Sequence, residues 1–375
     1  MNMNNLWARL SCWAALSLLC TAPLLAYADT STNISTAPGV QISLHGFIDT
    51  GFFWQDQNFA FGNGQNAEWP VANTTGSKNN LSGFDIRNTR AWLDFTGPAT
   101  DNGWKVSAHL EGDFFGGNNG TSAFSASQAT PRLRQAFFTL KSPDGGSSVT
   151  LGQQWDLLFP IEEVPASFTH IAFPLGLGTG MIGWRFTGIV YSQELNQGAE
   201  AGTAKWRLDL GAFNGSWNGP GNNVNFGTAG NANFNPQVEA RLHVDDGSWK
   251  SFITVHSSHE SLAGVGGAAP TPIASSITSY AVEAGTTWSS GPWSVLGSVY
   301  NGKGLGQVFG AMAQFGDIKE TGGYVQGGYK LDPHWGLYAT YATVRPNQGD
   351  VNTWIGNGGR LKNQQTGLDL LYSNG

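Results

Sequence analysis

Charged residues, cysteine and long apolar segments are all scarce in this chain. Asp, Glu, Lys and Arg make up 12% of the 375 residues, about half of the usage that is typical of soluble domains. The two cysteines, Cys12 and Cys20, both lie in the first 28 residues, so the rest of the chain needs no disulfide. No apolar run of about 20 residues follows those 28, which excludes a transmembrane helix there. So little charge is unusual for a soluble protein.

The first 28 residues have the organisation of a secretory signal peptide. Arg9 precedes an apolar run from Leu10 to Leu25, and Ala26-Tyr27-Ala28 is a small-residue cleavage site before Asp29. We expect cleavage after Ala28; the alternative is an uncleaved anchor helix. The remaining chain, 29–375, holds 18 basic and 26 acidic residues, and its formal charge of -8 argues against nucleic acid as a partner.

One segment shows the pattern on which the rest of the chain is built. Between Trp104 and Phe115 every second residue is apolar or glycine, whereas the residues between them include Lys105, His109, Glu111 and Asp113. Alternation with a period of two is typical of a strand with two different faces. An apolar face, a charged face, a length of about ten residues and aromatic ends together indicate a transmembrane barrel strand.

The same pattern recurs along the chain, with links that are short and long in turn. Short links face the periplasm and long loops the exterior in outer-membrane barrels. The sequence therefore predicts an all-β fold, a transmembrane antiparallel β-barrel with its domain at 29–375. The expected strands are roughly 40–53, 86–96, 104–115, 132–140, 148–155, 184–191, 205–213, 237–244, 249–257, 277–288, 293–300, 319–331, 335–344 and 361–372.

The alternation of links makes Ser373-Asn374-Gly375 a short periplasmic turn. A sheet with two open edges would expose unpaired backbone groups to lipid, which is costly. We therefore expect about two further C-terminal strands, which would give about sixteen in the complete barrel against about fourteen here.

Charged residues on the inward face are the candidates for lining the channel. Rings of charge at a narrow point determine which ions pass, although any single residue here has the simpler interpretation of a solvated wall charge. The pore-lining candidates are Arg90, Lys105, Glu111, Asp113, Arg132, Arg134, Arg185, Arg207 and Arg241, with Lys250, Asp49, Asp94, Asp209 and Glu239 as further inward charges. Basic residues equal or outnumber acidic ones, so we expect weak anion preference or near neutrality.

The link from Leu157 to Gly180 differs from the other long links because it is apolar and contains proline. Its only acidic residues are Glu162 and Glu163. An apolar loop is unfavourable in water, so we expect it to fold inward and narrow the pore, where the two acids would face the wall arginines. The alternative is a loop that packs at a subunit interface.

Known catalytic and cofactor motifs are missing. Gly178 to Gly183 matches G-x-G-x-x-G, but it leads into a predicted strand and not a helix, so it predicts no dinucleotide site. The patterns G-x-S-x-G, H-E-x-x-H and C-x-x-C do not occur. We therefore expect no enzyme activity, no metal and no cofactor.

Three segments carry a family resemblance. They are Glu111 to Gly116 (EGDFFG), Arg132 to Phe137 (RLRQAF) and Leu151 to Trp155 (LGQQW). In this order and spacing they resemble the Gram-negative outer-membrane porins, most closely the DcaP-like trimeric porins. The resemblance implies a homotrimeric barrel in outer-membrane lipid that passes ions and small hydrophilic solutes, often anionic ones such as dicarboxylates. It also implies inward-facing arginines at 132 and 134.

The leading hypothesis is thus a passive diffusion porin of the bacterial outer membrane. A barrel enzyme would need a serine or aspartate beside a histidine on the wall, and neither His45 nor His109 has such a serine partner by sequence. A plugged structural or adhesive barrel is the third hypothesis. Flux of sugars into liposomes separates the three.

Overall fold

The computed structural model describes residues 26–27, 32–59, 64, 69–70, 80–116, 129–167, 177–198, 200, 202–214, 235–261, 274 and 276–374. Most of the predicted signal peptide, with Arg9 and both cysteines, lies outside them, as does the middle of the predicted constriction loop at 168–176. Among the described residues no helix is long and apolar enough to cross a membrane.

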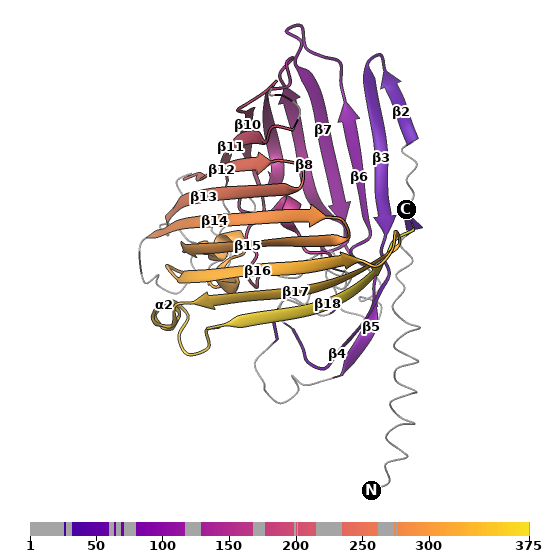
Figure 1. Cartoon of the computed structure of the whole chain (residues 1–375). Coiled ribbons are helices and arrows are strands. Elements are labelled where there is room, and N and C mark those ends of the chain that lie inside the picture. Colours follow the sequence, from indigo (N-terminus) through magenta and orange to yellow (C-terminus); the bar gives the residue numbers. More distant parts are fainter. Residues whose placement is uncertain are drawn as a thin grey trace, which may run out of the picture.

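Sixteen strands form one sheet in which all neighbours are antiparallel. In Figure 1 they follow one another around a curved wall, from β2 and β3 at one side to β17 and β18 at the other. The strands are β1 (Ala26–Tyr27), β2 (Thr32–Ala37), β3 (Val40–Ile48), β6 (Arg90–Thr96), β7 (Lys105–Asp113), β8 (Arg132–Lys141), β9 (Ser147–Trp155), β10 (Arg185–Glu194), β11 (Lys205–Phe213), β12 (Gln237–Asp245), β13 (Trp249–Ser261), β14 (Ser276–Ser290), β15 (Trp293–Lys303), β16 (Lys319–Lys330), β17 (Trp335–Pro346) and β18 (Asn363–Tyr372).

The strand order follows the chain, apart from one detour. From β3 the sheet continues to β6 and then in sequence to β18, while β1 and β2 both pair with β3. Each of the fourteen predicted segments overlaps one strand of this sheet, so the predicted all-β antiparallel fold is confirmed. In the part of the chain that the structure describes, β18 and the β1–β2 edge do not pair with each other.

The detour is a separate two-stranded ribbon of β4 (Gly51–Gln55) and β5 (Leu81–Asp85). The predicted strand 40–53 therefore leaves the sheet after Ile48, and Phe52 belongs to the ribbon. The backbone of Asp49 is tied instead to Thr89, whose Oγ1 accepts the Asp49 N–H at 3.1 Å. Period-two alternation continues through this point, so the sequence does not reveal the break.

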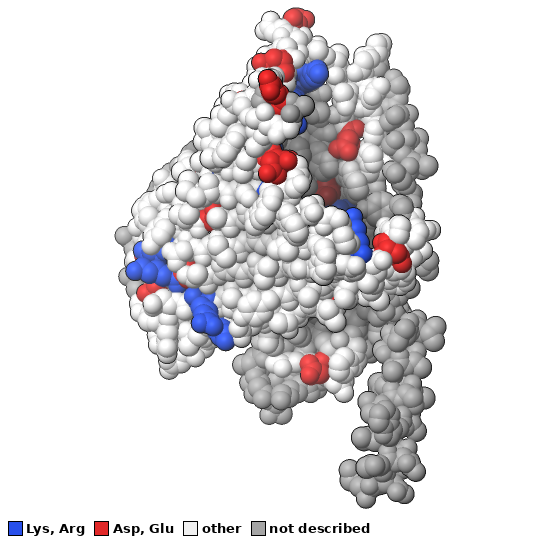
Figure 2. Space-filling view, viewed as in Figure 1, with Lys and Arg blue, Asp and Glu red and all other residues white. Residues whose placement is uncertain are grey.

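The two faces of the wall differ as the alternation predicts. On β14, Ser279 and Glu283 are buried, while Tyr280 and Val282 are about half exposed. Val282 lies opposite Val255 of β13, which is also half exposed. Figure 2 shows that the broad outer surface of these strands is almost free of charged side chains. An exposed apolar face of this kind is suited to lipid.

Short turns and long links alternate around the sheet. Aromatic side chains gather at the short-turn ends, where Trp249 contacts Trp288, Trp293 contacts Tyr329 and Trp335 contacts Tyr372 across neighbouring strands. Tryptophan and tyrosine in such a row form the aromatic girdle of a membrane barrel at the headgroup level. The short links are 97–104, 142–146, 195–204, 246–248, 291–292 and 331–334.

Two of the long links fold against the inner face of the wall. One is the predicted constriction loop, with the 3-10 helix η3 (Ile161–Glu163), and the other runs from Gly304 to Ile318 with η4 (Leu305–Val308) and η5 (Ala311–Ala313). We call the second segment the second inner loop. Apolar residues of both loops pack with wall residues into one buried cluster, which includes Leu157, Leu158, Ile182, Phe186, Phe213, Leu305, Val308 and Met312. A further helix, α2 (Gln348–Trp354), lies in the link between β17 and β18.

Candidate functional site

Five charged residues at the long-loop ends of β6, β7 and β8 form one ion-pair network. Arg132 makes a two-pronged contact with Asp113, with Nε–Oδ1 at 2.9 Å and Nη2–Oδ2 at 2.6 Å. Arg134 bridges both acids, contacting Glu111 at 2.5 Å and Asp113 at 2.8 Å. Arg90 approaches Glu111 at 3.6 Å. Planar guanidinium groups suit such two-pronged contacts with carboxylates.

A β-bulge interrupts the regular alternation of β8 at Arg134. Asp113 lies opposite Arg132, but Glu111 lies opposite Gln135, so β8 carries one extra residue at this point. Beyond the bulge the faces of β8 are exchanged. Phe137, which the alternation places on the lipid side with Leu133, instead stacks on His109 at a ring distance of 5.2 Å.

Arg185 is the fourth arginine of this region. It begins β10, is 7% exposed, and its guanidinium lies 4.5 Å from the ring of Trp184 and 4.9 Å from that of Trp155. The charged residues that interact electrostatically with Arg185 belong to the same network: Arg134, Arg132, Asp113 and Arg90. We call the set of Arg90, Arg132, Arg134, Arg185, Glu111 and Asp113 the arginine cluster. It holds four guanidinium groups against two carboxylates.

The constriction loop is held to the far wall along the part that the structure describes. Tyr324 Oη donates to the Glu163 carbonyl at 3.0 Å. The Gln326 side chain accepts from the Ala166 N–H and donates to the Ala166 carbonyl, both at 2.8 Å. The Asn363 amide donates to Thr179 Oγ1 at 2.6 Å. The loop thus crosses from β9 to β16 and β18 inside the sheet of its own chain.

The glycine motif serves this packing. Gly180 has a φ of +105°, and a Cβ there would lie 2.2 Å from the Gly323 carbonyl oxygen on β16. Gly183 has a φ of +100°, and its Cβ would lie 2.4 Å from the Phe159 nitrogen. Only glycine allows such approaches. The segment then enters β10, a strand as expected.

The two loop acids meet different surroundings. Glu162 forms an ion pair of 3.1 Å with Lys250 of β13, and both side chains are about 40% exposed. Glu163 is 3% exposed, and burial together with the neighbouring Glu162 raises its pKa to about 7 against the opposing charges of Arg241 and Lys250. Their basic partners are thus on β12 and β13, whereas the predicted partners were the wall arginines in general.

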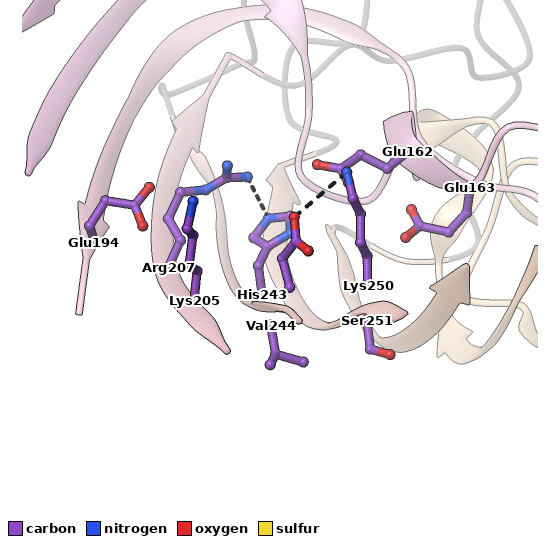
Figure 3. Close-up of a pocket in the computed structure, with 10 residues that line it drawn as sticks. Glu162, Glu163, Glu194, Lys205, Arg207, His243, Val244, Lys250 and Ser251 are labelled. Carbon is purple, nitrogen blue, oxygen red and sulfur yellow. Dashed lines mark hydrogen bonds and ion pairs between the residues drawn. The ribbon is translucent and has the colours of Figure 1, made fainter. Parts of the chain in front are cut away.

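A hollow opens beside Glu162 and Glu163, close to the short-turn ends of β10 to β13. Figure 3 shows that the loop acids lie on one side of it, with Lys205, Arg207 and Lys250 projecting from the wall strands. Arg207 Nε contacts Asp209 at 3.0 Å, and His243 Nε2 lies 2.8 Å from the same carboxylate. Glu194 and Asp245 of the wall also line the hollow, so acidic and basic groups lie close together around it.

The other candidates are more dispersed. Arg241 is 4% exposed and bonds to the Phe159 carbonyl of the constriction loop at 3.1 Å. Lys105 is exposed at the short-turn end of β7, away from the arginine cluster. Asp94 contacts His109 at 2.7 Å and His45 at 3.5 Å. Among the described residues no group of His, Cys, Asp or Glu is arranged to hold a metal ion.

The second inner loop was not predicted from the sequence. Its Val308 carbonyl accepts the Gly183 N–H at 2.7 Å, and its Phe309 ring stacks on Trp184 at 4.9 Å. Ala311, Met312 and Ala313 all have φ values between 46° and 49°, a left-handed conformation that non-glycine residues seldom adopt. The available signal was its composition, since Leu305, Val308, Phe309, Met312 and Phe315 are apolar in a link that should be polar.

An apolar outer face, an aromatic girdle, a charged inner face and inward-folded loops together define a channel protein of the outer-membrane β-barrel class. The chain belongs to the Gram-negative porin family, whose model matches residues 15–349. The resemblance seen in the sequence is thereby confirmed. No sequence among the curated proteins matches significantly.

Solved structures share the fold at low sequence identity. The outer membrane channel DcaP of Acinetobacter baumannii is 17% identical, with a TM-score of 0.68 over 91% of this chain and 89% of that chain. Salmonella typhi OmpF in complex with daunomycin is 13% identical, with a TM-score of 0.56 over 92% of this chain and 89% of that chain. An anion-selective porin from Comamonas acidovorans is 13% identical, with a TM-score of 0.54 over 90% of this chain and 85% of that chain.

Proposed function

We propose that this porin passes small hydrophilic solutes by passive diffusion and prefers anions, including small carboxylates. The arginine cluster carries the proposal, because four guanidinium groups face two carboxylates on one part of the inner wall. Arg185 Nη1 and Arg90 Nε have no hydrogen-bond partner among the described residues. Both nitrogens are buried, so these two arginines act on a passing anion through their charge and not by direct contact. The fold shared with an anion-selective porin is consistent with this preference.

The test is the reversal potential of single channels in a salt gradient. We expect a weak anion preference in the wild type. Arg185→Ala should lower the anion-to-cation permeability ratio about two- to fivefold, because one excess positive charge beside the ion path interacts with a passing ion by about 0.5–1 kcal/mol. Arg345→Ala is the matched control, since Arg345 is exposed on β17. Strong cation selectivity in the wild type would contradict the proposal.

The buried apolar cluster formed by the two inner loops favours a second candidate, a barrel that its own loops close. Swelling of liposomes in sugars of increasing size separates the two. A channel admits small sugars and excludes large ones, whereas a plugged barrel admits none.

We also propose a homotrimer, by the resemblance to the DcaP-like trimeric porins, an outer-membrane location, and signal cleavage after Ala28. The detergent-extracted protein should have the mass of three mature chains by native mass spectrometry, and each chain should begin at Asp29. A monomer, or a chain that begins elsewhere, would contradict the corresponding part of the proposal.

A further inference from the structure

Three buried polar side chains on β12, β13 and β14 form a continuous chain of hydrogen bonds. His256 Nδ1 lies 2.8 Å from Glu239 Oε1, and His256 Nε2 lies 3.0 Å from Ser279 Oγ. The side chains of Glu239 and His256 are fully buried, as is Ser279. Glu239 and His256 face each other directly in the sheet register. Burying such groups is costly unless each has a partner, and here each has one.

The order serine, histidine, carboxylate at these distances also occurs in hydrolases that use serine as a nucleophile. The surroundings exclude that role here. Ser279 is 0% exposed, and Gly304 at the start of the second inner loop lies beside it, because a Cβ on Gly304 would lie 3.3 Å from the Ser279 Cα. The hollow of Figure 3 is lined by other residues. A solute therefore has no access to the serine oxygen.

The chain of bonds ends instead on the constriction loop. Glu239 Oε2 accepts the Leu157 N–H at 2.6 Å. Two further wall groups hold the same short stretch, since Thr254 Oγ1 donates to the Leu157 carbonyl at 3.2 Å and Arg241 to the Phe159 carbonyl at 3.1 Å. The first residues of the loop are thus fixed by side chains of β12 and β13, and Glu239 is the acceptor among them.

His256 determines how Glu239 is held. With the proton on Nδ1, the imidazole donates to Glu239 and its Nε2 accepts the Ser279 hydroxyl proton, so all three groups are satisfied. Gln237 Nε2 donates to the same carboxylate at 2.6 Å. These bonds leave Oε2 aimed at the loop. A carboxylate oriented from behind in this way keeps its position better than one that is free to rotate.

We propose that Glu239, His256 and Ser279 are a positioning relay that fixes the start of the constriction loop and thereby the width of the channel. The effect on channel width rests on the proposed function. Because Ser279 also lies against Gly304, the relay touches the beginnings of both inner loops.

Hydrogen–deuterium exchange of residues 156–163 in the purified full-length protein tests the relay without reference to transport. Glu239→Gln and His256→Gln should each speed exchange on the order of tenfold, which corresponds to the loss of one buried hydrogen bond. Ser279→Ala should also speed exchange, but by a smaller factor. The double variant of His256 and Ser279 should match His256→Gln alone, because the two act as one unit. The liposome-swelling assay should show a less sharp size limit for sugars in Glu239→Gln and His256→Gln, and a smaller change in Ser279→Ala.

His259→Gln is the matched control, since His259 lies on the same strand but is exposed and contacts Thr278 Oγ1, at 3.2 Å, on the neighbouring strand. It should exchange like the wild type.

If His256→Gln does not fold, as judged by heat-modifiable electrophoretic mobility, Ser279→Ala carries the test because it removes a single hydroxyl. Wild-type exchange in Ser279→Ala and Glu239→Gln would overturn the proposal. So would specific labelling of Ser279 by a fluorophosphonate, which would make it a nucleophile. Absence of sugar flux in the wild type would reject the channel but leave the exchange result valid.

Discussion

Arg134 is 4% exposed, and its two partners, Glu111 and Asp113, are buried with it. Arg134→Ala would leave two carboxylates with less compensation, and breaking a buried ion pair typically costs about 3–5 kcal/mol. We expect a loss of that order in the free energy of unfolding, measured by urea titration in detergent. Arg132→Ala should cost less, because Arg132 is 24% exposed and Asp113 keeps its contact with Arg134.

Arg345→Ala is the control for both changes and should unfold like the wild type. The opposite result is also informative. Unchanged stability in Arg134→Ala together with a shift of selectivity toward cations would mean that the arginine lines the pore and does not anchor the wall.

Glu163 predicts a dependence of selectivity on pH. Its pKa is raised to about 7 by burial and by Glu162, so the carboxyl is neutral at lower pH and charged above. A raised pKa in an acid means that the folded state favours the protonated form, so loop packing is strongest below about pH 4.5 and weakens as the pH rises through 7. The anion-to-cation permeability ratio should therefore fall between about pH 6 and 8. Glu163→Gln should remove this step, and a step that persists in the variant would assign it to another group.

At the scale of the element, the constriction loop packs closely against the backbone of β16 at Gly180. Gly180→Ala would place a methyl group 2.2 Å from the Gly323 carbonyl oxygen, so the loop must move away from β16. We expect faster hydrogen exchange around 177–183 and a changed single-channel conductance. Gly198→Ala has a similarly positive φ, +79°, with nothing within 4 Å, and controls for the conformational cost alone. Equal effects of the two changes would show that contact with β16 does not hold the loop.

The whole molecule should respond to charge on its outer wall according to depth. Val255 is 48% exposed near the middle of β13, opposite Val282. Val255→Arg should destabilise the barrel in lipid by about 2–4 kcal/mol, as expected for arginine at the bilayer midplane. Ser248→Arg, in the exposed turn before β13, should be nearly neutral. Urea unfolding in lipid vesicles measures both, and equal stability would place Val255 outside the lipid-facing band.

The sequence alone determined the class of fold because a barrel strand needs only local information. Alternation with a period of two fixes which face meets lipid, and the regular change between short and long links fixes the direction of each strand. All fourteen predicted strands are present for this reason. The ribbon of β4 and β5 and the short strands β1 and β2 were missed, because their pairing depends on partners and not on a pattern of their own.

The interior was decided by tertiary structure. The bulge at Arg134, which turns Phe137 inward, depends on the register between β7 and β8, which no single strand encodes. The same is true of the pairing of Glu162 with Lys250 and of the relay from Glu239 through His256 to Ser279. These contacts join residues that are 17 to 88 positions apart in the chain, so only the folded wall and the loops packed inside it bring them within hydrogen-bond distance.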